Sequence, residues 1–351
     1  MGLRNSLFRT ALNALYFSGA HVLLRPLIGG VGAILMLHHV RPPRRDRFQP
    51  NRLLEVTPHY FEGVIRRLRR SGVDLVSLDE MHRRMTAGEF KRRFVCVTFD
   101  DGYRDNREFA YPILKRYEVP FAIYVATSFA DRIGELWWLA LEAVIARNDM
   151  IGLRMDGRDM MFPCASVTQK RDLYAHIFSW LRGLKSEAEL RDVVRELAAR
   201  YRVDIAAYVK ELCMDWSELG ELAADPLCTI GAHTVNHPIL AMVPETAVRS
   251  ELENSRAVIE AALGGRPQHL AYPVGDRGAA GPREFKIASD LGYKTAVTTR
   301  PGALFRAHAQ HLTALPRISL NGEFQRQRYA RVLVSGTATA LWNRLRPLNV
   351  R

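Results

Sequence analysis

The chain has 351 residues, of which 48% are hydrophobic and 25% charged, as in an ordinary globular protein. Its four cysteines lie far apart and form no C-x-x-C pair, which argues against a disulfide framework or a cysteine zinc site. The formal net charge of +13 permits nucleic acid, an anionic membrane surface or an acidic substrate as a partner. The sequence has no helix-turn-helix, zinc-finger or RNP pattern, so we expect no specific nucleic-acid partner.

Residues 1–30 are predicted to form an amphipathic N-terminal segment, with a helix over residues 3–24. Two largely apolar stretches, 10–24 and 26–40, are divided by Arg25, and neither reaches the roughly 20 residues that a transmembrane helix needs. No clear signal-peptide cleavage site follows. We therefore expect a cytoplasmic protein, with peripheral contact between the first helix and an anionic membrane surface as a further option.

Strands and helices are predicted to alternate over residues 31–130. Apolar runs suited to buried strands occur at Val31–Leu37, Phe94–Phe99 and Phe121–Ala126. Between the first two, Thr57 and Pro58 have the character of an N-cap and a first helical residue, and apolar residues follow at helical spacing. Another helix is predicted over residues 106–117. The alternation indicates parallel strands with helices outside them.

Basic residues cluster in this part of the chain. Nine Lys or Arg residues lie between Arg66 and Arg93. A solvated helical face is the simpler interpretation, and a patch that faces a membrane or an anionic glycolipid is the functional alternative.

The alternation is interrupted by a mostly helical insertion at about residues 132–222. A hairpin is predicted around Asp156 and Gly157, followed by helices at 168–183 and 186–201. Trp137 and Trp138 are more typical of core packing than of a ligand platform.

Alternation returns after the insertion. Strands are predicted at 228–231, 268–271 and 294–298, with helices at 244–263 and 283–291. Residues 315–318 are expected to end the ordered core, and residues 321–351 to form a basic, helical tail.

Two polar motifs follow predicted strands directly. Asp100 and Asp101 come after the strand FVCVTF, and adjacent carboxylates repel each other unless a cation compensates. His233 and His237 follow another strand, four residues apart, and can converge on one ion if the chain turns once. Active sites of (β/α) barrels lie at such strand ends. A His–His–Asp set suits a divalent metal, with zinc as the expected ion.

The sequence TFDDG at residues 98–102, followed by HTVNHP at 233–238, resembles the polysaccharide deacetylase family, also called the NodB-homology or carbohydrate esterase 4 family. The resemblance extends over residues 31–130 and 215–320. It implies an α/β fold, a distorted (β/α) barrel, here with the helical insertion. It also implies removal of N- or O-acetyl groups from glycans such as chitin oligomers or peptidoglycan.

The resemblance also implies roles for individual residues. Asp100 matches the catalytic base, whereas Asp101, His233 and His237 match the metal ligands. Thr234 matches a hydroxyl residue that supports the second motif. The third motif, AYPVG at residues 271–275, would form one wall of the substrate groove, and the expected substrate-binding residues are Tyr103, Tyr272, Pro273 and Val274.

The chain departs from the family pattern in the third motif. Ala271 stands where the family commonly has the arginine that steadies the base, and Arg317 is the predicted replacement. Val274 stands where an aromatic residue is common, but its N–H can still serve the oxyanion.

The usual late histidine that acts as the acid is not evident, although His308 and His311 lie near its place. The early element HHV resembles that of the exopolysaccharide-deacetylase branch. His38 is preferred to its neighbour His39 as the catalytic acid, because only one of two successive residues in an extended segment faces the site.

The sequence therefore predicts a metal-dependent hydrolase that removes acyl groups from amino sugars of a poly- or oligosaccharide. One alternative is a deformylase or deacetylase of a lipid-linked sugar, and another is a non-catalytic glycan-binding protein on the same fold.

Overall fold

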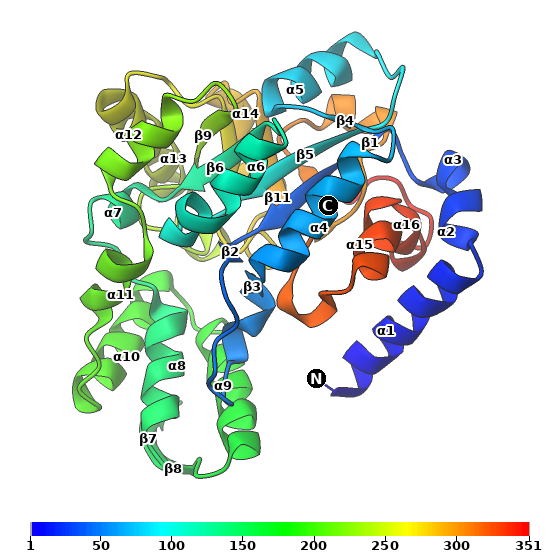
Figure 1. Cartoon of the computed structure of the whole chain (residues 1–351). Helices are drawn as coiled ribbons and strands as arrows, with labels where there is room; N and C mark the ends of the chain where they lie inside the picture. Colours follow the sequence, from blue (N-terminus) through cyan, green and yellow to red (C-terminus); the bar gives the residue numbers. More distant parts are fainter. Residues whose placement is uncertain (1, 351) are drawn as a thin grey trace.

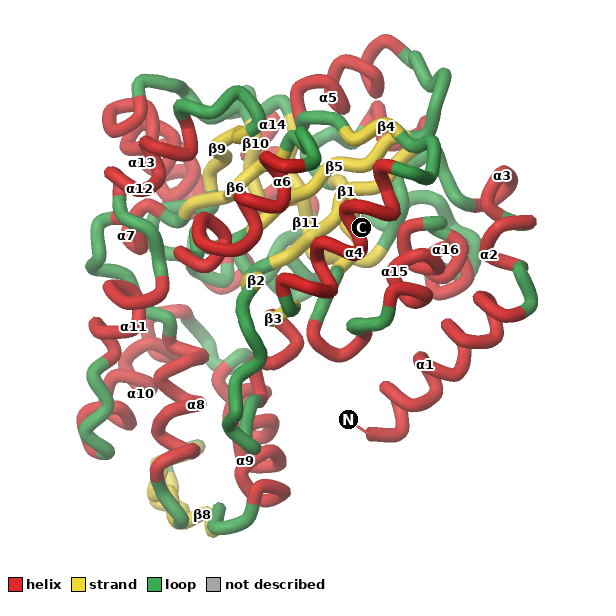
Figure 2. The backbone as a smooth tube through the Cα atoms, in the orientation of Figure 1, coloured by secondary structure: helices red, strands yellow, loops and turns green. Residues whose placement is uncertain are grey.

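The computed structural model describes residues 2–350 as a closed barrel of parallel strands with helices outside it (Figures 1 and 2). The barrel strands are β1 (Gly32–Leu37), β5 (Phe94–Phe99), β6 (Phe121–Val125), β9 (Cys228–Ala232), β10 (His269–Ala271), β11 (Thr295–Pro301) and β12 (Leu315–Ser319). Their order is β1-β12-β11-β10-β9-β6-β5, and β5 pairs with β1 to close the ring. A short strand, β4 (Asp74–Leu75), pairs with the first residues of β5, Phe94 and Val95.

The barrel strands are apolar because the ring is filled inside and covered outside. All six residues of β5 are buried, as expected for a parallel strand between helices. The covering helices include α4 (Pro58–Arg69), α5 (Leu78–Ala87), α6 (Tyr111–Arg116), α13 (Glu245–Leu263) and α14 (Pro282–Asp290). In α4 the side chain of Thr57 accepts a hydrogen bond from the N–H of Tyr60, which confirms the predicted N-cap. The helix predicted over residues 106–117 begins with a π-helical turn at Asn106–Ala110 and continues as α6.

The closure between β1 and β5 brings two predicted site residues together. Leu37 pairs with Phe99, so that His38 and Asp100 leave the barrel side by side. The strands are parallel, so β9 ends at the same mouth, directly before His233. A two-stranded ribbon of β2 (His39–Val40) and β3 (Glu55–Val56) continues from this mouth.

The chain between β6 and β9 forms the mostly helical insertion that the sequence predicts. Its elements are α7 (Thr127–Ala130), α8 (Trp137–Arg147), β7 (Met150–Met155), β8 (Arg158–Pro163), α9 (Val167–Leu181), α10 (Glu187–Arg200), α11 (Ile205–Leu212) and α12 (Trp216–Ala223). The predicted hairpin is confirmed, because β7 and β8 pair antiparallel with Met155 opposite Arg158. Figure 1 shows α8, α9 and the hairpin extending away from the barrel. A separate hydrophobic core unites the insertion and reaches the barrel mouth at Tyr103 and Phe129.

The N-terminal segment differs from its prediction. The single helix expected over residues 3–24 is wrong, because Gly19 has a left-handed backbone (φ 72°) that divides it into α1 (Gly2–Phe17) and α2 (Ala20–Leu23). A third helix, α3 (Arg25–Ile28), follows. Leu12 on α1 is buried in the main core, and no helix of residues 2–350 is long and apolar enough to cross a bilayer.

The C-terminal tail is helical, as predicted, but the expectation that the ordered core ends at residue 318 is wrong. Helix α15 (Gln327–Val334) packs against α1 and α4, and α16 (Thr337–Trp342) follows it. Tyr329, Val332 and Leu333 are buried in the same core as the barrel strands. The apolar residues of this tail therefore complete the barrel's outer layer. The division of the chain into an N-terminal helix, a barrel and a tail stays a prediction.

Candidate active site

A buried carboxylate and a buried arginine form the floor of the site. Asp100 follows β5 and is 2% exposed, and Arg317, in β12, is fully buried. The two terminal nitrogens of Arg317 donate to the two carboxylate oxygens of Asp100, at 2.7 and 2.6 Å. Two further hydrogen bonds fix the plane of the guanidinium. Its Nε donates to the Thr298 carbonyl, and its Nη1 donates to the Thr98 hydroxyl. The structure thus gives Arg317 the contact with Asp100 that the sequence predicts.

This pairing decides the charge of Asp100. Burial alone would raise the pKa of its carboxyl group, but the Arg317 guanidinium outweighs that effect, and the pKa lies below its usual value. Asp100 is therefore ionised and held in one orientation, which are two properties that a base requires.

The three predicted metal ligands converge beside this pair. The Nε2 atoms of His233 and His237 lie 3.4 and 3.3 Å from Oδ1 of Asp101, and one ligand atom from each residue lies within 4.8 Å of the others. All three residues are buried. Burial would raise the pKa of Asp101, but the two histidine side chains beside it outweigh burial and hold the pKa well below its usual value. Oδ1 of Asp101 has no hydrogen-bond partner among the described residues.

These residues fit a divalent cation. Nδ1 of His233 contacts the carbonyl oxygen of Ala271 at 2.7 Å, so it carries the proton and leaves Nε2 free as a ligand. A buried carboxylate oxygen without a donor is costly unless a cation approaches it. Two imidazole nitrogens and one carboxylate oxygen match the donor set of zinc sites that keep open positions for water and substrate.

The loop between the two histidines is held by its own side chains. The Thr234 hydroxyl accepts a hydrogen bond from the N–H of His237 at 3.0 Å, in agreement with the supporting role implied for Thr234. Glu251, on α13, accepts from the N–H groups of Val235 and Asn236 and from the Asn236 side chain. Glu251 was missed in the sequence because it belongs to a helix that has no motif of its own.

Each of the three motifs contains a residue other than glycine in a left-handed backbone conformation. Asp101, Thr234, His237 and Val274 have φ values of 70°, 68°, 55° and 59°. Such values cost about 1–3 kcal/mol each for residues other than glycine, and the cost is greatest for β-branched residues such as Val274. The surrounding contacts must maintain them, as is typical of functional sites.

His38 and His39 face different ways. Nε2 of His38 lies 3.9 Å from a carboxylate oxygen of Asp100, and the side chain is 17% exposed. Burial lowers the pKa of His38, against the opposing effect of Asp100 and Asp101. Nδ1 of His39 instead contacts Asp105 at 2.6 Å. Of the two, His38 is thus the one that faces Asp100, and its role as the acid stays a prediction.

Asp105 and Asn106, which follow the first motif, hold the segment that contains His38 and His39. Besides His39, Asp105 accepts a hydrogen bond from the N–H of Val40, and Asn106 donates to the carbonyl of His38 at 2.7 Å. The run RDN after TFDDGY was the available signal, but nothing in the sequence showed that it meets β2.

His308 and His311, the two histidines late in the chain, lie away from Asp100. His308 is fully buried, and its Nδ1 accepts from the N–H of Phe305 at 3.0 Å. The neighbouring Leu304 bridges to Gly32, at the start of β1 and so at the opposite end of that strand from His38. His311 follows in the same segment. Neither is near Asp100.

The predicted substrate-binding residues differ in accessibility. Tyr272 is fully buried and donates to the carbonyl of Thr313, and Tyr103 is fully buried with its ring stacked on His39 at 3.6 Å. Pro273 is buried, whereas Val274 is half-buried. The N–H of Val274 has no acceptor among residues 2–350. The substrate roles of all four stay predictions, and Val274 retains the free donor that its role requires.

The insertion contributes to this site. Trp137 and Trp138 are buried, as expected of core residues, but the Trp138 ring also lies 5.1 Å from the ring of His237. Phe129, on α7, stacks on the same imidazole at 5.7 Å. The aromatic start of the insertion therefore confines one of the predicted ligands.

Most of the barrel matches one family model. The model is described as polysaccharide deacetylase and matches residues 87–154 and 164–296. The chain belongs to the polysaccharide deacetylase family. This confirms the resemblance seen in the TFDDG and HTVNHP motifs.

Individual relatives of this family are distant. YxkH of Bacillus subtilis (strain 168), which is named for the same family, is 21% identical over 267 residues, or 76% of this chain and 66% of that protein. The Streptococcus pyogenes deacetylase PplD in complex with acetate has a TM-score of 0.51 at 21% identity, covering 83% of this chain and 92% of PplD. A de-N-acetylase from Aggregatibacter actinomycetemcomitans has a TM-score of 0.55 at 13% identity, covering 86% and 99%. At such identities the solved structures show the fold, and they confirm the predicted barrel.

Proposed function

We propose that this chain is a metal-dependent hydrolase that removes N-acetyl groups from amino sugars of a poly- or oligosaccharide. The observation that carries the proposal is the pairing of an ionised, arginine-bound Asp100 with the Asp101, His233 and His237 cluster at one barrel mouth. Membership of the polysaccharide deacetylase family supports the reaction class. The names of two structural neighbours, a deacetylase with acetate and a de-N-acetylase, agree with it.

The proposed roles of these residues rest on the distances between them. A divalent ion held by Asp101, His233 and His237 would polarise the acyl carbonyl and supply a water molecule of lowered pKa. Asp100 accepts the proton of the attacking water, and Arg317 keeps its carboxylate aimed at the mouth.

Two groups complete the reaction on the substrate side. The free N–H of Val274 donates to the oxygen that becomes negative when the acyl carbon turns tetrahedral. His38, in its protonated form, would give a proton to the departing amine, and its position 3.9 Å from Asp100 supports this role.

The alternatives have less support. A glycan-binding protein without activity was suggested by the missing arginine at Ala271, but Arg317 now supplies a guanidinium to Asp100. No contact of the site favours a lipid-linked sugar over a polysaccharide.

The test is acetate release from a panel of N-acetylated glycans, measured before and after treatment with a chelator and after addition of zinc. We expect activity to disappear with the chelator and return with the metal. Asp100→Asn should remove turnover and leave metal content unchanged, because Asp100 is not a ligand in this arrangement. Asp159→Asn, an exposed carboxylate on the hairpin, is the matched control. Near wild-type turnover by Asp100→Asn would show that the base is another group.

A further inference from the structure

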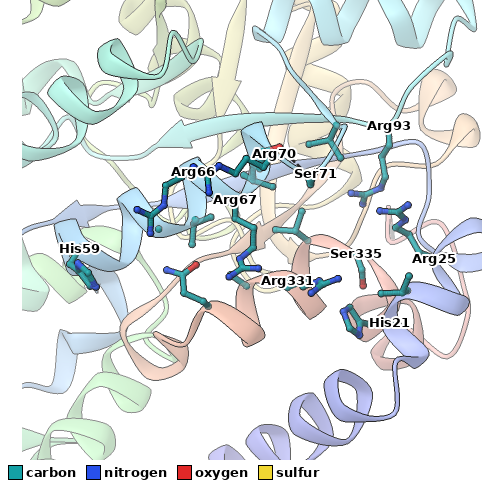
Figure 3. Close-up of a pocket in the computed structure, with 18 residues that line it drawn as sticks. His21, Arg25, His59, Arg66, Arg67, Arg70, Ser71, Arg93, Arg331 and Ser335 are labelled. Carbon is teal, nitrogen blue, oxygen red and sulfur yellow. Dashed lines mark hydrogen bonds between the residues drawn. The ribbon is translucent and has the colours of Figure 1, made fainter.

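A basic cleft runs along the outside of the barrel, between α4 on one side and α2, α3 and α15 on the other (Figure 3). Its volume is about 630 Å³. Figure 3 shows Arg67 and Arg331 approaching the space from opposite walls, with Arg25 and Arg93 together at one end. The basic cleft is lined by six arginines, Arg25, Arg66, Arg67, Arg70, Arg93 and Arg331, and by His21 and His59. No Asp or Glu is among the described residues that line it.

The arginines of the basic cleft differ from the other basic residues of the same sequence cluster. Arg83 and Arg84 form ion pairs with acidic neighbours such as Glu80, so their charges are balanced locally. None of the six cleft arginines has a carboxylate within ion-pair distance among the described residues. Unbalanced like charges that share one cleft repel each other, and an anion removes that repulsion.

Two lining side chains each contain a buried nitrogen that has no hydrogen-bond partner among the described residues. His21 is 3% exposed, and its buried Nε2 atom has no hydrogen-bond partner within residues 2–350. Nε of Arg93 is likewise unpartnered, and its terminal nitrogen contacts only backbone carbonyls, at Gly29 and Gly32. Burial and the nearby charge of Arg25 lower the pKa of Arg93 to about 10. A bound anion would accept a hydrogen bond from the Nε–H of Arg93.

Exposed apolar side chains lie on α2 and on α3, the helix that begins with Arg25. Val22, which lines the basic cleft, is 43% exposed, and Leu23 and Leu27 are 74% and 79% exposed. A soluble polyanion would leave these leucines in water, whereas a bilayer accommodates apolar side chains next to basic ones. The combination therefore favours a lipid surface over nucleic acid or polyphosphate.

The basic cleft is distinct from the predicted active site. Arg93 directly precedes β5, and Asp100 directly follows it. At a rise of about 3.3 Å per residue, the two positions lie roughly 20 Å apart along that strand. An occupant of the cleft at Arg93 would leave the barrel mouth open.

We infer that the basic cleft binds the phosphate headgroups of an anionic phospholipid bilayer, with Leu23 and Leu27 entering the lipid beside it. The test is co-sedimentation of the full chain with vesicles of phosphatidylcholine alone and of phosphatidylcholine mixed with phosphatidylglycerol. We expect binding to the anionic vesicles only, weakening as salt is added.

The variants replace side chains that are exposed to solvent, so that the fold is preserved. Arg66, Arg67 and Arg70 are exposed, so replacing all three with alanine removes charge with little loss of packing. At roughly fivefold per basic residue, the triple variant should bind anionic vesicles about 100-fold more weakly. The matched control replaces three exposed arginines outside the cleft, Arg45, Arg154 and Arg158, and should bind less than tenfold more weakly. A double variant, Leu23→Ser with Leu27→Ser, should weaken the vesicle binding that remains at high salt, because that binding depends on apolar side chains in the lipid.

Several results would overturn the inference. One is equal binding to neutral and anionic vesicles, and another is equal loss in the triple variant and its control. Unchanged salt-resistant binding in the leucine variant would exclude lipid entry. Binding of polyphosphate or duplex DNA through these arginines, without binding to vesicles, would make the cleft a site for a soluble polyanion.

Discussion

Replacing Arg317 with glutamine tests the arrangement on which the proposed reaction depends. The substitution removes the two charge-assisted hydrogen bonds to Asp100 and leaves a carboxylate that is 2% exposed without a counter-charge. Each such bond contributes about 1.5–3 kcal/mol. Breaking a buried pair by removing one partner typically costs about 3–5 kcal/mol. We therefore expect a loss of about 3–5 kcal/mol in the free energy of unfolding.

The effect on activity should be larger than an overall loss of stability would explain. Without the two guanidinium donors of Arg317, the carboxylate of Asp100 can rotate away from the mouth. A displacement of a catalytic group by about 1 Å can lower the rate on the order of 100-fold. Arg317→Lys keeps the charge but not the paired geometry, so it should fall between the wild type and Arg317→Gln in both measurements.

Urea unfolding followed by tryptophan fluorescence gives the stability, and acetate release per folded molecule gives the activity. The matched control is Arg256→Gln, because Arg256 is also a buried arginine, but it bonds only to backbone carbonyls, at Pro267, Leu291 and Gly292. The control should lose stability and keep its activity per folded molecule. If Arg317→Gln behaved like this control, Arg317 would be a structural residue and its link to the base would be refuted.

Three further predictions address other residues. His38→Gln should lower acetate release by about 100-fold or more, the usual effect of losing a general acid, with metal content unchanged; full activity would exclude His38 as the acid. Asp101→Asn should weaken zinc binding, measured by calorimetry, by more than about 100-fold, because the variant loses a metal ligand and not merely a residue that hydrogen-bonds to one. Undiminished zinc affinity would place the ion elsewhere. The pKa of His308 is lowered to about 4 by burial, so the unfolded chain takes up a proton first as pH falls, and stability is lost between about pH 6.5 and 4, by roughly 3 kcal/mol. His308→Gln should flatten that part of the urea midpoint profile, and an unchanged profile would show that His308 does not cause it.

The sequence predicted the parts of the site that are local in the chain. Asp100 and Asp101 end one strand, and His233 begins the segment after another, so parallel strands bring them to one mouth whatever lies between them. The pairing of Arg317 with Asp100 was inferred only from the position of Arg317 after the last predicted strand. Its geometry depends on the closure of β1 against both β5 and β12, which no short pattern encodes.

What could not be predicted depends on contacts between distant segments. Glu251 supports the His233 loop from a helix whose sequence shows only amphipathic spacing. Leu12 and Tyr329 lie more than 300 residues apart and are buried in one core, so neither terminal segment reveals its burial from its own pattern. The break at Gly19 illustrates the same limit, since a glycine inside a helical pattern is often tolerated.

The way in which the insertion joins the barrel has a consequence for engineering. Strands β6 and β9 are parallel, so the chain leaves β6 at the mouth and enters β9 at the other end of the barrel. The two ends of the insertion nevertheless meet, because Arg132 forms an ion pair with Asp215 and the Trp216 indole donates to Asp131 at 2.7 Å. Lengthening or shortening a segment whose ends already meet costs little, because loop-closure entropy grows slowly with length. Apart from the aromatic start that contacts His237 and Arg191, which donates to the carbonyl oxygen of Asn236 at 2.8 Å, the segment can therefore be exchanged between homologues as a cassette. Chimeras of this kind would separate the choice of glycan from the cleavage step.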